Sequence, residues 1–161
     1  MMANITVNIA DFKSGQAPDM LVTYALGSCI GISIYDKLMH IGALGHIMLP
    51  GEDLEKTKET PMRFATSCIP MMLDALSKLG CAKANMEARI AGGANIITFS
   101  NESSLNSIGF RNATAVRKTL LRQGIRIVGE DIGKDYARTM FLNPGTGEVT
   151  IKTYGNGNYK I

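Results

Sequence analysis

A chain of 161 residues is long enough to fold as one domain, and its 45% hydrophobic and 19% charged residues exclude an intrinsically disordered protein. The net charge of +3 comes from dispersed basic residues, and aromatic residues make up only 6%, which argues against nucleic-acid binding. No signal peptide and no apolar window of ~18 residues is present, so we expect a cytoplasmic protein without membrane insertion. Its three cysteines lack C-x-x-C spacing and predict neither a disulfide framework nor a metal site.

The first 50 residues predict three or four strands. Apolar residues alternate with polar or small residues in four stretches, at 3–10, 20–25, 29–35 and 40–49. KSGQAPD and DKL separate these stretches and are typical of turns. A charged surface loop, GEDLEKTKETP, then ends at Pro61, which suits the first turn of a helix.

Residues 61–80 have helical spacing and end at Gly80. Pro70 lies inside this segment, where it removes a backbone donor, so we expect a kink or two short helices there. Cys68 lies on the inner stripe of the helix and Cys81 follows its end. Both thiols are therefore expected to be packing residues.

The second half alternates strands and helix. We expect a strand within 82–94, a polar surface excursion at 95–109, an amphipathic helix at 111–124, a strand at 125–133, a hairpin around NPGTG and a flexible turn cluster, YGNGNY. Gly92 and Gly93 are expected to form a tight turn rather than a close approach to a substrate segment. Strands lead and close the chain, which favours an α+β fold.

The candidate site starts from Cys29, which follows a Gly-Ser pair, because a nucleophilic cysteine needs a partner base. His40 and His46 are six residues apart on one predicted strand, so both are expected on the same face. If a hairpin turn centres on 36–38, His46 lies opposite the start of the Cys29 strand. The residues alone leave two interpretations open: buried structural side chains, or a catalytic pair.

Several motifs recur in order over residues 20–153: TYALGSC, GHIMLP, ARIAGGAN, IGFRNATAV, GEDIGKDYAR and TGEVTIK. With them the chain resembles the CheD family of chemoreceptor glutamine deamidases. The resemblance implies two packed mixed β-sheets flanked by helices in a single domain over 1–161, similar to the catalytic domains of bacterial deamidating toxins.

The same resemblance implies a site. Cys29 matches the family nucleophile, His46 its base and Thr23 the third member of its triad, whereas His40 has no counterpart. Glutamine deamidation through an acyl-enzyme intermediate would use these three groups. From the turn geometry we add the Cys29 backbone N–H, presented by Gly27 and Ser28, as the candidate oxyanion donor.

The implied substrates are the cytoplasmic helices of methyl-accepting chemoreceptors, and glutamyl methyl esters on them are a second implied substrate. No cofactor is expected. An alternative also implied by the resemblance is a non-catalytic regulatory partner of the CheC phosphatase. A proteolytic or transglutaminating cysteine enzyme is a further alternative, because it would use the same thiol and base.

Overall fold

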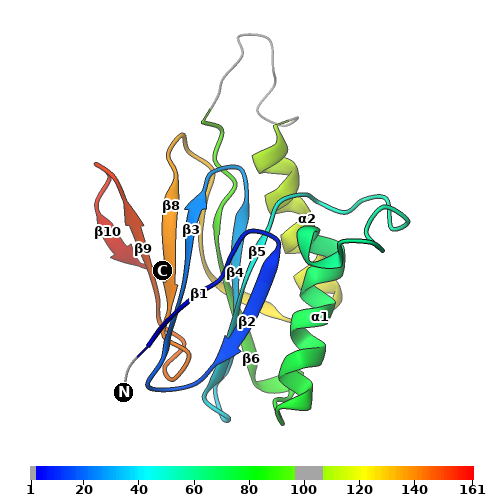
Figure 1. Ribbon diagram of the computed structural model, residues 1–161, viewed down its shortest axis with the longest axis vertical. Coiled ribbons are helices and arrows are strands. Elements are labelled where there is room, and N and C mark those ends of the chain that lie inside the picture. Colours follow the sequence, from blue (N-terminus) through cyan, green and yellow to red (C-terminus); the bar gives the residue numbers. More distant parts are fainter. Residues whose placement is uncertain (1–2, 97–106) are drawn as a thin grey trace.

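Two five-stranded sheets stack face to face, and two α-helices cover the outer face of one of them (Figure 1). The computed structural model describes residues 3–96 and 107–161. Its elements are β1 (Asn4–Thr6), β2 (Asp11–Gly15), β3 (Met20–Leu26), β4 (Ile30–Asp36), β5 (Ile41–Ile47), the 3-10 turn η1 (Pro61–Arg63), α1 (Ala65–Lys78), the 3-10 turn η2 (Lys83–Asn85), β6 (Met86–Gly92), α2 (Ile108–Arg122), β7 (Arg126–Ile132), β8 (Arg138–Leu142), β9 (Val149–Thr153) and β10 (Asn158–Lys160).

Both sheets are mixed, as expected for the predicted α+β class. The first sheet has the order β1-β3-β8-β9-β10 and the second has the order β2-β5-β4-β6-β7. The β1–β3 and β6–β7 pairs are parallel, and the remaining neighbours are antiparallel. In the described part of the chain, no helix is long and apolar enough to cross a membrane.

Strand β4 lies in the middle of the second sheet and is buried along its whole length. Ile30, Ile32 and Ile34 belong to the core formed with α1 and α2. The alternate residues face the first sheet, where a β-carbon on Gly31 would overlap Met140. One face of β4 therefore packs in the core with the helices, and the other face packs against the first sheet. At Gly31 the two sheets are too close for a larger side chain.

One continuous helix spans 65–78 with Pro70 inside it, so the predicted alternative of two short helices is wrong, and the kink stays a prediction. The interruption lies earlier, at Phe64, whose backbone is extended between η1 and α1. A proline costs the helix one backbone hydrogen bond, while Ile69 and Met72 on either side of it pack fully buried against the sheet. Cys68 and Cys81 are buried, as expected of packing residues.

Two edge strands were not expected. Strand β2 occupies residues placed partly in a turn, and β10 overlaps the end of the predicted flexible cluster. Each of these strands has a single neighbouring strand, β5 for β2 and β9 for β10. Hydrogen bonds to that neighbour form the strand, and the local sequence pattern does not indicate them.

The predicted surface excursion at 95–109 falls largely on 97–106, outside the described residues. Helix α2 begins at Ile108, three residues before the predicted start, after the N-cap Ser107.

Candidate active site

Thr23 and His46 meet across the gap between the two sheets. Thr23 lies on β3 of the first sheet, His46 lies on β5 of the second, and both are fully buried. The Thr23 Oγ1 and His46 Nδ1 atoms are 2.7 Å apart. The same hydroxyl donates to the Val7 carbonyl oxygen at 2.8 Å.

These two contacts determine which ring nitrogen of His46 carries the proton. A hydroxyl has one hydrogen, and the Val7 carbonyl can only accept, so Thr23 Oγ1 must accept from Nδ1–H. The Nε2 atom of His46 then keeps its lone pair. This atom is buried and has no hydrogen-bond partner among the described residues. The imidazole is therefore arranged to receive a proton at Nε2.

Burial also keeps both candidate reacting groups neutral. It lowers the pKa of His46 from 6.5 to about 4. Burial raises the pKa of the Cys29 thiol, an effect that the thiol's own backbone N–H partly opposes. At neutral pH the groups are a thiol and a neutral imidazole, so a base must remove the thiol proton when the sulfur attacks.

Cys29 immediately precedes β4, and its side chain is partly buried in the core between the sheets. In the β4–β5 hairpin, Gly31 pairs with His46. Cys29 lies two residues before Gly31, just outside the strand, and its side chain packs in the core between the sheets, where His46 meets Thr23. The predicted hairpin and its register are confirmed to within two residues.

His40 does not lie on the strand that carries His46, so the prediction that the two histidines share one strand is wrong. Strand β5 begins at Ile41, and His40 lies in the preceding turn with a φ of 54°. Its Nδ1 atom is 2.8 Å from the Tyr35 hydroxyl, near the end of β4 that is farther from Cys29. The turn spans 37–40 because β4 and β5 pair up to Asp36 and Ile41.

The segment after β6 holds the backbone of the Cys29 turn. Ala94 N–H donates to the Gly27 carbonyl at 2.8 Å, and Gly93 N–H donates to the Cys29 carbonyl at 2.9 Å. Gly92 has a φ of 117°, and a β-carbon there would overlap the Cys29 carbonyl oxygen. The predicted tight turn is therefore not found: Gly92 ends β6, and the glycine pair instead allows a close approach to the chain's own Cys29 turn.

Asn112 is a third contact of this turn and was missed by the sequence analysis. Its fully buried side chain donates from Nδ2 to the Ser28 carbonyl at 2.9 Å and to the Met48 carbonyl at 2.8 Å. A signal was present, because Asn112 falls within the stripe of α2 that contains Ala113 and Val116. A polar residue in an apolar stripe calls for buried hydrogen-bond partners.

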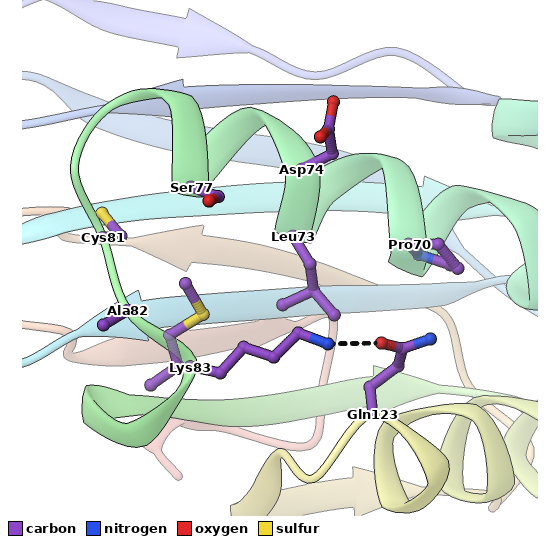
Figure 2. A pocket seen from close by; sticks show the side chains of 9 residues that line it. Pro70, Leu73, Asp74, Ser77, Cys81, Ala82, Lys83 and Gln123 are labelled. Atoms are coloured by element: carbon purple, nitrogen blue, oxygen red, sulfur yellow. Dashed lines mark hydrogen bonds between the residues drawn. The ribbon is translucent and has the colours of Figure 1, made fainter.

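A separate pocket of about 560 Å³ lies beside the C-terminal half of α1 (Figure 2). Lys83 Nζ donates to Gln123 Oε1 at 2.7 Å across it. Thr23, Cys29 and His46 are not among its lining residues, which are Pro70, Leu73, Asp74, Ser77, Cys81, Ala82, Lys83, Met86 and Gln123.

The chain is similar to known proteins over nearly its whole length. Residues 48–153 match the family model described as CheD chemotactic sensory transduction. The chain is 43% identical over 157 residues to a protein of Clostridium botulinum strain Hall named probable chemoreceptor glutamine deamidase CheD, covering 98% of this chain and 97% of that protein. A protein of the same name from Clostridium kluyveri is 42% identical with the same coverage.

Proposed function

This chain belongs to the CheD family, and on that premise we propose that it deamidates glutamine side chains on the cytoplasmic helices of bacterial chemoreceptors. The observation that carries the mechanism is the Thr23–His46 hydrogen bond. It holds a neutral imidazole with a free Nε2 between the sheets, in the core where the Cys29 side chain also packs. A partly buried thiol and a buried neutral imidazole supply the nucleophile and the base that acyl transfer from an amide requires.

The first half of the reaction forms a thioester. Nε2 of His46 takes the Cys29 proton as the sulfur attacks the carbon of the substrate carboxamide, and the carbonyl oxygen becomes an oxyanion. The imidazolium then gives its proton to the amide nitrogen, which leaves as ammonia. The Cys29 backbone N–H, held by the Gly27–Ser28 turn, is the proposed donor to the oxyanion.

The second half releases the product. Nε2 of His46 takes a proton from water, whose oxygen attacks the thioester carbon. The carbon–sulfur bond breaks, the thiolate of Cys29 regains the proton, and a glutamate side chain remains on the receptor. The chain's net charge of +3 complements an acidic receptor surface.

Thr23→Val should lower kcat about 10²-fold, because valine has the shape of threonine but cannot accept from His46 Nδ1–H. Without that acceptor the imidazole can carry its proton on Nε2, the wrong nitrogen for a base. Thr23→Ser keeps the hydroxyl and should retain most of the activity. Steady-state deamidation rates for both variants check this expectation. Equal rates for the valine and serine variants would contradict the role of the hydroxyl.

Incubation with a purified receptor cytoplasmic fragment tests the proposed function. We expect ammonia release and a mass gain of about 1 Da per modified glutamine, with no incorporation of an added primary amine. Amine incorporation would identify a transglutaminase, and peptide cleavage would identify a protease. A receptor that binds the protein but gains no mass would overturn the deamidase proposal and favour the regulatory alternative.

A further inference from the structure

We infer that Asn112 is a positioning residue of this reaction, which orients the Cys29 backbone N–H toward the oxyanion; the inference rests on the proposed function. The residue lies in the second turn of α2, on a different element from Thr23, Cys29 and His46. Its side chain is nevertheless the link between the nucleophile turn and the chain that follows the base.

The orientation of the Asn112 amide follows from its partners. The Ser28 and Met48 carbonyl oxygens both accept, at 2.9 and 2.8 Å, so the NH2 group and not the oxygen must face them. Both hydrogens are then used, and Asn112 has none left for a substrate. The Oδ1 atom is buried without a hydrogen-bond partner in the described part of the chain. An unpaired buried oxygen is costly, so this residue is a poor choice for stability alone.

The Ser28 contact acts on Cys29 through the peptide plane. The Ser28 carbonyl and the Cys29 N–H belong to one rigid peptide unit, and in a trans peptide they point in opposite directions. Holding the carbonyl on Asn112 therefore directs the N–H away from α2. Burial raises the pKa of the Cys29 thiol, and this N–H partly opposes that rise because it favours a negative charge on the sulfur. When the sulfur attacks the substrate carbon, the oxyanion forms on the oxygen bonded to that carbon. This oxygen therefore lies close to the sulfur and to the same N–H.

All three carbonyls of the Gly27–Ser28–Cys29 turn are held, and Asn112 supplies the only side-chain donor among the hydrogen bonds described for them. The flanking carbonyls accept from backbone N–H groups of Ala94 and Gly93. The central carbonyl, which shares its peptide with the Cys29 N–H, accepts from Asn112. The second hydrogen bond, to Met48, ties the same amide to the residue two positions after His46. One side chain thus fixes the N–H relative to the base.

Asn112→Asp tests this role, because a carboxyl has the same shape but offers at most one hydrogen to the two carbonyl oxygens that Asn112 holds. We expect kcat to fall about 10²-fold with KM changed less than about threefold, as on loss of one oxyanion donor. Alkylation of Cys29 by iodoacetamide forms no oxyanion, so its limiting rate at high pH, where the thiol is fully ionised, should stay within about threefold of wild type. A purely structural role would change kcat, alkylation and thermal unfolding together.

Thr119→Val is the matched control, since it removes a buried hydroxyl on the same helix that donates to the Ala115 carbonyl, and it should leave kcat unchanged. A folded, fully active Asn112→Asp variant, or parallel loss of kcat and alkylation, would overturn the inference alone. A wild-type protein that leaves the receptor unmodified would overturn the proposed function as well.

Should both Asn112→Asp and Asn112→Ala fail to fold, wild-type NMR decides. We expect slow exchange of the Asn112 side-chain NH2 and scalar couplings across its hydrogen bonds to the Ser28 and Met48 carbonyls. Fast exchange without couplings would remove the basis of the inference.

Discussion

Cys29→Ser should lower kcat for receptor deamidation by at least about 10³-fold while the protein keeps its fold. A serine hydroxyl is far less acidic than a thiol and needs a stronger base. Burial lowers the pKa of His46 to about 4, which makes the imidazole a weak base. Such a base can take a thiol proton as attack proceeds but is poorly matched to a hydroxyl. We therefore expect the proposed site to work with a sulfur nucleophile and not with a hydroxyl.

Cys81→Ser is the control for this prediction, because it makes the same atomic change at the other end of β4. Cys81 is buried and hydrogen-bonds Asp36, and a serine hydroxyl can make that bond too. Receptor mass spectra and urea unfolding should be recorded for both variants. We expect a folded but inactive Cys29→Ser and a folded, active Cys81→Ser. Activity of Cys29→Ser within tenfold of wild type would exclude Cys29 as the nucleophile.

The Cys29–His46 relation could be predicted because it lies within one hairpin. Alternation and a short turn fix the register between β4 and β5, so the sequence alone placed His46 near the start of the Cys29 strand. His40 was misplaced because the turn is one residue longer than the predicted 36–38, and it ends at His40 rather than before it. Local patterns locate a strand end only to within a few residues.

The contacts between sheets and helices could not be predicted in the same way. Thr23 reaches His46 from the opposite sheet, and no local pattern reports how two sheets stack. Thr23 was assigned from the family resemblance and not from a local pattern in the sequence. Asn112 matched that resemblance as part of IGFRNATAV but was interpreted only as a helix residue. Its importance depends on where α2 packs, which is a tertiary property.

His46 should also make the stability of the protein depend on pH between about 6.5 and 4. The ordinary pKa of histidine is 6.5, and burial lowers the pKa of His46 to about 4 in the folded protein. Between these values the unfolded chain binds a proton at His46 and the folded protein does not. The contribution of neutral His46 to the free energy of unfolding is fully present above pH 6.5 and is lost as the pH falls toward 4. Between pH 7.5 and 5.0 we expect a loss of about 2 kcal/mol in the free energy of unfolding.

This window belongs to His46 rather than to the carboxylates with shifted pKa values. Hydrogen bonds from backbone N–H groups lower the pKa of Asp36, and Arg138 and Tyr159 lower that of Asp131, from an ordinary value of 3.8 despite burial that opposes both shifts. Their stabilising effects are lost below about pH 4. Protonation of these two groups therefore contributes little to the change between pH 7.5 and 5.0.

Urea unfolding at pH 7.5 and 5.0 checks the pH dependence with three proteins. Wild type and His40→Gln, which alters the exposed turn histidine, should both lose about 2 kcal/mol. His46→Gln removes the titrating group and should lose much less over the same interval, whatever its stability at pH 7.5. An equal loss in His46→Gln and wild type would mean that the buried imidazole is not neutral in the folded protein. Since the proposed mechanism uses the neutral ring as its base, the same unfolding curves bear directly on the chemistry at Cys29.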